Sequence, residues 1–123
     1  MKAALCIAMA GALGALARWG IVRWCDSTRG DGAFPLGILV ANVGGCFLFG
    51  WFFGYLENRP GISDAVKLAL FSGFLGSLTT FSTFGWNTFD LVRNGQPLLA
   101  LSNVGLSLFA GLGAVWGGYA LGR

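Results

Sequence analysis

The residues with the most chemical potential lie in an uncharged run, Leu68 to Phe89, which is long enough to cross a bilayer. The middle of this run reads GFLGSLTTFSTF, Gly73 to Phe84. Hydroxyl groups alternate there with phenylalanine rings: the hydroxyls belong to Ser77, Thr79, Thr80, Ser82 and Thr83, and the rings to Phe81 and Phe84. Because hydrocarbon offers polar groups no partners, a span that keeps so many of them indicates a buried functional centre.

The backbone of the same stretch is weakened as a helix. Gly73 and Gly76 are poor helix formers, and the β-branched Thr79 and Thr80 do not restore the helix. Non-helical backbone at membrane depth persists where protein or a water-filled cavity satisfies it. We therefore predict a break near Gly76 to Thr79. Carbonyl groups freed by the break would suit a cation, whereas freed amides and a new helix N-terminus favour an anion.

Two other apolar segments contribute isolated polar groups. Asn42 lies well inside NVGGCFLFG, and an amide in hydrocarbon is costly unless it has a partner. Asn103 and Ser107 are four residues apart and share one helical face. One interpretation is that each group forms hydrogen bonds that hold helices together. Taken together with the hydroxyl-rich stretch, however, they favour a polar pathway through the membrane.

The charges favour an anion as the solute. No acidic residue lies within the predicted spans, which argues against a proton-coupled exporter of cations. Arg18 falls inside a predicted span, where its long stem could carry the charge to the interface or its charge could draw anions into a vestibule. Hydroxyl and amide donors suit an anion, and so do the positive ring edges of Phe81 and Phe84.

These residues must be positioned by membrane-spanning helices. Hydrophobic residues make up 55% of the 123-residue chain and charged residues 11%, against about 25% in soluble domains. We predict an all-α integral membrane protein with a single domain, residues 1–123. Of the four predicted spans, the first and third are Ala3 to Val22 and Leu68 to Phe89; the second begins after Pro35 and ends near Leu56, and the fourth begins after Pro97 and ends at Leu121. Met1 to Ala17 also has the pattern of a signal peptide, but we expect it to stay as the first span because the other three need a helical partner.

The residue types argue against an enzyme. Histidine, the commonest general base and metal ligand, is absent. Cys6, Cys25 and Cys46 lack the spacing of a metal site. We expect neither catalysis, nor a disulfide, nor a metal held by cysteine.

The basic residues predict an unusual topology. Four spans place both termini on one side, with Lys2, Arg59, Lys67 and Arg123, whereas Arg18, Arg23, Arg29 and Arg93 lie toward the other side. The positive-inside rule orients a chain by an unequal number of basic residues on its two sides. Because the two numbers are equal here, we expect copies to insert in both orientations. The alternative is that one dominant charge, such as that of Lys2, orients the chain.

Small residues recur at four-residue spacing, which allows close approach of helices in lipid. The pairs are Ala10 and Gly14, Ala41 and Gly45, Gly50 and Gly54, Gly113 and Gly117, and Gly118 and Gly122. Because four short helices barely enclose a pathway, we expect a homo-oligomer. The balanced charge favours an antiparallel homodimer.

Three segments, GALGALARW (Gly11 to Trp19), PLGILVANVGGCFLFG (Pro35 to Gly50) and GFLGSLTTFSTF, resemble the Fluc (CrcB) family of fluoride channels. The resemblance covers essentially the whole chain. It implies passive, fluoride-selective export across the plasma membrane of a bacterium, which protects the cell from fluoride. It also implies an antiparallel, dual-topology homodimer with two pores, each lined by both subunits.

The resemblance also implies roles for individual residues. Phe81 and Phe84 would line the fluoride path, Asn42 would be the pore amide and Arg18 the vestibule arginine. Weaker candidates for a polar track are Thr80, Ser82, Thr83 and Ser107. A structural Na⁺ at the dimer centre would be held by backbone carbonyls, here those of Gly76 and Thr79 from each subunit. The sequence has Ile38 and Asn87 where the family commonly has Thr and Glu, which leaves the rate of conduction open.

Two other functions remain open. One is a small dual-topology transporter of drugs or other cationic solutes, against which the missing membrane carboxylate argues. The other is a non-transporting accessory membrane protein, whose polar residues serve to hold helices together.

Overall fold

The computed structural model describes residues 2–27 and 33–123, and every regular element in these residues is a helix. Four segments are long and apolar enough to cross a membrane, within the part of the chain that is described. They comprise α1 (Lys2–Asp26), α2 (Leu36–Glu57), the composite third segment, and α6 (Pro97–Gly122). The third segment consists of α3 (Asp64–Leu68), the π-helix η1 (Ala69–Leu75), α4 (Gly76–Leu78) and α5 (Phe81–Arg93). The prediction of an all-helical protein with four membrane-length segments is confirmed.

The helices extend past the predicted spans. The first continues to Asp26 instead of ending near Val22, and the third begins at Asp64 instead of Leu68. Hydropathy marks the part of a helix that suits hydrocarbon, whereas the helix itself continues through its charged terminal turns. The Asp26 carboxylate accepts a hydrogen bond from the Gly37 amide at 3.2 Å, which ties the end of α1 to the start of α2.

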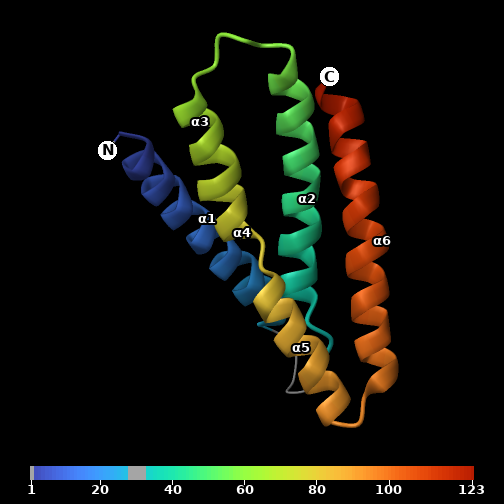
Figure 1. Ribbon diagram of the computed structural model, residues 1–123. Coiled ribbons are helices and arrows are strands. Elements are labelled where there is room, and N and C mark those ends of the chain that lie inside the picture. The colour runs from blue at the N-terminus through green and yellow to red at the C-terminus, as the bar shows by residue number, and fades with distance from the viewer. Residues whose placement is uncertain (1, 28–32) are drawn as a thin grey trace.

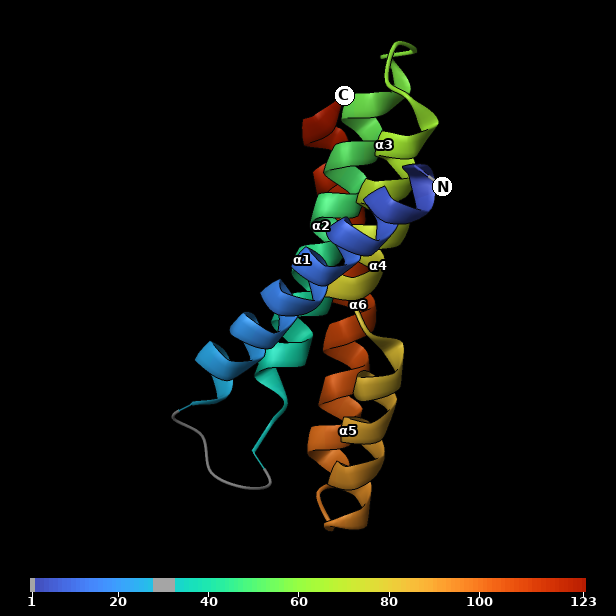
Figure 2. The same ribbon diagram turned by 90° about the vertical axis from the view of Figure 1, so that its left-hand side faces the viewer.

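The segments form one bundle in which α2 and α6 run side by side and α1 crosses obliquely (Figures 1 and 2). α1 packs on η1 and α4, and α5 packs mainly on α6. Both ends of the chain lie at the same end of the bundle as the connection between α2 and α3 (Figure 1). This arrangement puts Lys2, Arg59, Lys67 and Arg123 toward that end, while Arg23 and Arg93 lie in the last turns of α1 and α5. Arg29 lies outside the described residues.

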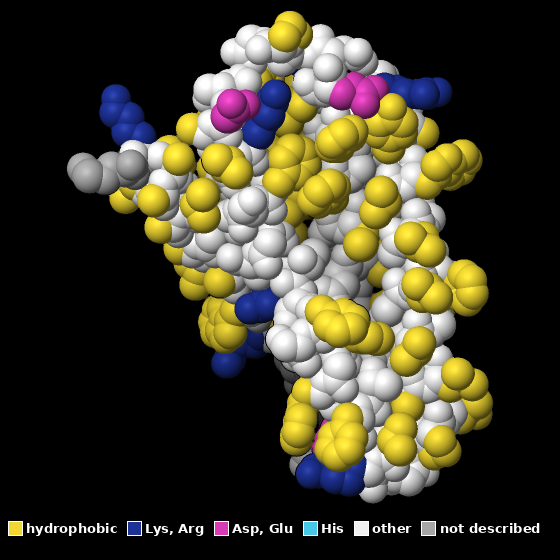
Figure 3. All heavy atoms as spheres, in the orientation of Figure 1, with side chains coloured by type: hydrophobic (Ala, Val, Ile, Leu, Met, Phe, Trp, Pro, Cys, Tyr) yellow, Lys and Arg dark blue, Asp and Glu magenta, His cyan; other side chains and the backbone are white. Residues whose placement is uncertain are grey.

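The surface is consistent with a lipid environment. Hydrophobic side chains are spread over the whole height of the face shown in Figure 3, acidic side chains appear near its two ends, and basic side chains appear both at the ends and near the middle. Large apolar residues such as Leu13, Phe109 and Trp116 are more exposed than buried. Such broad apolar exposure is far beyond what a soluble monomer carries and suits contact with lipid or another helix.

Glycines bring α2 and α6 into backbone contact. A Cβ added at Gly50 would lie 2.1 Å from the carbonyl oxygen of Val115, and one added at Gly118 would lie 2.1 Å from that of Phe47. Gly14 makes an equally close approach to Phe74 between α1 and η1. Gly113, in contrast, faces open space with respect to the described atoms of the other helices. The small-residue pairs therefore differ, because some lie at helix contacts within the chain and others do not.

The third segment loses its helical geometry at two residues. Thr79 has φ −91° and ψ 156°, and Thr80 has φ −152° and ψ 119°, whereas Gly76 keeps helical angles of −62° and −32°. The extended residues thus lie at the threonines and not at the glycines. Gly73 instead allows close contact with α1, since an added Cβ there would lie 2.8 Å from the Ile7 carbonyl oxygen.

Candidate functional site

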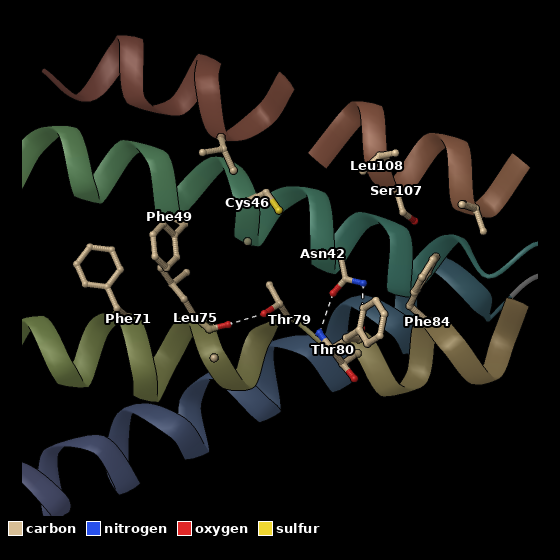
Figure 4. Close-up of a pocket in the computed structure, with 15 residues that line it drawn as sticks. Asn42, Cys46, Phe49, Phe71, Leu75, Thr79, Thr80, Phe84, Ser107 and Leu108 are labelled. Atoms are coloured by element: carbon tan, nitrogen blue, oxygen red, sulfur yellow. Dashed lines mark hydrogen bonds between the residues drawn. The ribbon is translucent and has the colours of Figure 1, made fainter. Parts of the chain in front are cut away.

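A hollow of about 620 Å³ opens beside the extended residues, at the middle of the membrane-length helices. Figure 4 shows that its walls come from α2, from the third segment on both sides of Thr79 and Thr80, and from α6. Most of the predicted site residues line it: Asn42, Gly76, Thr79, Thr80, Phe81, Phe84 and Ser107. Apolar side chains, including Phe49, Phe71 and Leu75, form much of the remaining wall. The hollow is therefore a largely apolar space with a few polar groups at one end.

Asn42 fixes the conformation of the extended residues. Its Oδ1 accepts a hydrogen bond from the Thr80 amide at 2.8 Å, and its Nδ2 donates to the Thr80 carbonyl at 3.1 Å. One side chain thus satisfies both backbone groups of a residue that is 9% exposed. In a continuous helix the Thr80 amide would donate to the Gly76 carbonyl, so the Asn42 amide replaces a helical partner. The sequence predicted that the Asn42 amide needs a polar partner, and this partner is the backbone of Thr80.

The Thr80 hydroxyl caps the N-terminus of α5. Its Oγ1 accepts a hydrogen bond from the Thr83 amide at 3.3 Å, the contact of an N-cap, and donates to the Thr83 hydroxyl at 3.1 Å. The Ser82 hydroxyl lies 3.2 Å from the same oxygen. Ser82 and Thr83 do not line the hollow, so they meet the other site residues through Thr80. The three hydroxyls form one connected cluster at the start of α5.

The two phenylalanine rings stand together where α5 begins. The Phe81 and Phe84 centroids are 5.6 Å apart and the ring planes are inclined by 42°. The Phe81 side chain is 83% exposed although it borders the hollow. A large apolar ring in this position is covered in the membrane either by lipid or by another protein surface.

The Arg18 guanidinium reaches the extended residues from α1. Its NH1 group donates to the Thr79 carbonyl oxygen at 3.4 Å. Of the two placements that the sequence left open, this contact puts the charge next to the site. Arg18 does not line the hollow itself. The charge therefore lies next to the site but outside the walls of the hollow.

The two polar residues of α6 have separate environments. The Ser107 hydroxyl oxygen is buried beside the hollow and has no hydrogen-bond partner among the described residues. Asn103, one helical turn away, is 2% exposed and donates through Nδ2 to the Thr88 hydroxyl at 2.9 Å. The shared face predicted for them is thus divided, because Asn103 holds α5 while Ser107 faces the hollow. Thr88 was missed, since its sequence neighbours give no sign of a partner on α6.

The backbone carbonyls at the site suit a hard cation. The Gly76 carbonyl has lost its helical donor to Asn42. The Thr79 carbonyl has lost its helical donor, the Thr83 amide, to Thr80 Oγ1, although the Arg18 guanidinium donates to it. Carbonyl oxygens are ligands that hard cations accept. The two predicted carbonyls of one chain supply two oxygens, which is fewer than a cation needs. The carbonyls of Gly76 and Thr79 could therefore supply part of a cation site.

Membrane-length helices around a central hollow, with polar groups at the point where one helix is interrupted, define a multi-pass membrane protein of the kind that forms solute pathways. The profile of the family described as "CrcB-like protein, Camphor Resistance (CrcB)" matches residues 5–119. The chain belongs to this family, which confirms both the resemblance seen in the sequence and the prediction of a protein that is not an enzyme.

Several relatives are similar over nearly their whole length. A protein of Nitratidesulfovibrio vulgaris named "Fluoride-specific ion channel FluC" is 38% identical over 123 residues, covering 100% of this chain and 98% of the relative. "Fluoride-specific ion channel FluC 2" of Symbiobacterium thermophilum is 44% identical over 115 residues, covering 94% and 93%. "Fluoride-specific ion channel FluC 1" of Geobacillus kaustophilus is 37% identical over 123 residues, covering 100% of both chains.

Proposed function

We propose that the protein is a fluoride-selective channel that lets F⁻ leave the cell passively across the bacterial plasma membrane. The observation that carries the proposal is the set of polar and aromatic groups assembled around Thr80 in the middle of the membrane-length helices. The names of the full-length relatives support fluoride as the ion. Export would protect the cell from fluoride that accumulates inside.

The chemistry of the site favours an anion that has shed water. The second Nδ2 proton of Asn42 and the Ser107 hydroxyl supply hydrogen-bond donors at the hollow, and the Ser82 and Thr83 hydroxyls lie next to it through Thr80. The edges of the Phe81 and Phe84 rings supply weak positive charge without strong binding. Such weak contacts allow an ion both to enter a site and to leave it, which conduction requires. The Arg18 charge next to Thr79 would raise the local concentration of anions.

The same site gives no support to a proton-coupled transporter of cations. The carboxylate that such a protein needs at membrane depth is missing from all four predicted spans. The accessory interpretation explains the bonds of Asn42 and Asn103, but not the unpartnered Ser107 hydroxyl at the hollow.

The working unit in this proposal is an antiparallel homodimer with two pores. The even division of basic residues supports insertion in both orientations. The exposed Phe81 ring and the open hollow support a pathway completed by a second copy. In such a dimer the interrupted third segments would meet near the centre.

A Na⁺ ion at that meeting point would have a structural role. The carbonyls of Gly76 and Thr79 from two copies would offer four oxygens, all from groups that have lost their helical donors. The cation would neutralise these dipoles and hold the two interruptions in register. The Arg18 guanidinium, which also approaches the Thr79 carbonyl, would limit how strongly the ion binds.

The proposal is tested by fluoride efflux from liposomes that contain the purified protein. We expect rapid release of F⁻, read with a fluoride electrode, and no release of Cl⁻ from matched liposomes. A Phe81→Ile variant that still forms the dimer should release F⁻ much more slowly. Absence of F⁻ release from folded protein would favour the accessory interpretation, and transport that depends on a proton gradient would favour the cation transporter.

A further inference from the structure

The helix that carries the two rings is poorly held by apolar packing. Leu91, near its C-terminal end, is the one buried residue among those described on α5. The side chains of Phe81, Trp86 and Phe89 are mostly exposed. Phe84, Thr88 and Leu91 are among the less exposed residues of α5 and share one face of the helix, and α5 packs mainly on α6. With one buried apolar side chain on this face, the polar contact of Thr88 with α6 is the other interaction that bears on where the rings point.

A chain of two hydrogen bonds joins the middle of α5 to α6. Asn103 Nδ2 donates to Thr88 Oγ1 at 2.9 Å, and Thr88 Oγ1 donates to the Phe84 carbonyl oxygen at 2.8 Å. The Thr88 hydroxyl has one proton, which it gives to Phe84, so it meets Asn103 as an acceptor. Asn103 is 2% exposed, and in such a low-dielectric environment linked hydrogen bonds strengthen each other.

We propose that Asn103 is a positioning residue that fixes the rotation of α5 on α6 through Thr88 and thereby aims the Phe84 ring. The proposal rests on the assignment of Phe84 to the ion pathway. Side-chain tips lie about 5–6 Å from a helix axis, so a rotation of about 20° would move the ring by about 2 Å. That displacement is enough to separate a ring edge from a small anion. Asn42 holds the N-terminal end of the same helix, so Asn103 would provide the second fixed point.

A role limited to holding helices together makes a different prediction. In that case, loss of the Asn103 bond would lower the amount of folded protein but leave the ring and the transport rate of the folded fraction unchanged. A positioning role changes both properties in protein that remains folded and dimeric. Asn103→Leu and Thr88→Val each remove the bond while conserving side-chain size.

The matched control is Ser102→Ala. The Ser102 hydroxyl donates to the Leu98 carbonyl within α6 at 2.8 Å and so makes the same type of intrahelical bond as Thr88, without a link to α5. Its removal should change neither the ring nor the transport rate. The comparison separates loss of a hydroxyl from loss of the α5–α6 link.

The test combines two readouts on the full-length dimer. 4-Fluorophenylalanine incorporated at position 84 reports the environment of the ring by ¹⁹F NMR, independently of transport. We expect Asn103→Leu and Thr88→Val to shift or broaden this resonance in the same way, and the double variant to add nothing further. Without the label, each variant should slow fluoride efflux about tenfold, which corresponds to a rise of about 1.4 kcal/mol in the barrier to permeation.

The outcomes distinguish this proposal from the proposed function. An unchanged ¹⁹F resonance in folded Asn103→Leu protein would overturn the positioning role, even if fluoride efflux by the original protein is normal. Additive changes in the double variant would overturn it as well. A shifted resonance together with no fluoride efflux by the original protein would support the positioning of Phe84 and refute the fluoride channel.

Discussion

The close contact of glycines between α2 and α6 predicts that adding one methyl group lowers the stability on one face of α6 relative to the other face. A Cβ at Gly118 would lie 2.1 Å from the Phe47 carbonyl oxygen and 3.0 Å from the Trp51 amide nitrogen. Both neighbours are backbone atoms, which cannot rotate away as a side chain could. Gly118→Ala must therefore push α2 and α6 apart by roughly 1.4 Å, given that non-bonded heavy atoms settle at about 3.5 Å.

The size of this loss in stability follows from a comparison with Gly113→Ala, on the opposite face of α6. Both substitutions gain helix propensity, up to about 1 kcal/mol, and this gain cancels between them. Overpacking costs about 1–3 kcal/mol, and lipid supplies no hydrophobic effect to restore the contact. Gly118→Ala should thus be less stable than Gly113→Ala by about 1–3 kcal/mol.

Reversible unfolding of the detergent-solubilised protein by SDS, followed by circular dichroism, measures this difference. Gly50→Ala should behave as Gly118→Ala does, because Gly50 makes the reciprocal contact with Val115. Equal stabilities for the Gly118 and Gly113 variants would refute the argument that close backbone approach holds these two helices together.

Three further predictions concern the site and the topology. Asn42→Leu leaves the Thr80 amide without its acceptor and should lower the free energy of unfolding by about 1–3 kcal/mol, measured in the same SDS assay, with Ser102→Ala as an unaffected control. Gly45→Ala would place a methyl group 2.3 Å from Thr79 Cγ2 and slow fluoride efflux, and Thr79→Ser should rescue it by removing Cγ2. Failure of that rescue would show that Gly45 acts elsewhere. Asn58→Lys adds a charge at the end that holds both termini and should bias a C-terminal reporter to the cytoplasm, whereas equal labelling from both sides is expected without it. An unbiased Asn58→Lys protein would contradict charge as the determinant of orientation.

The helical architecture was predictable because hydropathy and charge divide this chain cleanly. Apolar runs with little or no charge gave the number of spans and their approximate positions, including the starts of α2 and α6 near Pro35 and Pro97. Helix ends were less accurate, since α1 and α3 extend into charged turns that hydropathy excludes. The π-helix from Ala69 to Leu75 was not predicted, because no residue type marks its wider hydrogen-bond spacing.

The site was predictable as a set of residue types but not as a set of contacts. Polar groups in apolar spans indicated which side chains needed partners, and most of them line one hollow. Their partners were not predictable, because Asn42 and Thr80 are 38 residues apart and meet only through packing of α2 on the third segment. The same limit explains why Thr88 was missed. It also explains why the break was predicted near Gly76 to Thr79, whereas the extended residues are Thr79 and Thr80, next to the Asn42 side chain.

The most direct test of the central claim is the reversal potential of the purified protein in a planar bilayer. A tenfold fluoride gradient with symmetrical chloride should give a reversal potential of about 59 mV in magnitude, as expected for a passive univalent ion. A tenfold chloride gradient with symmetrical fluoride should give a value near zero. A potential that follows the chloride or proton gradient, or no current from a folded dimer, would contradict the account.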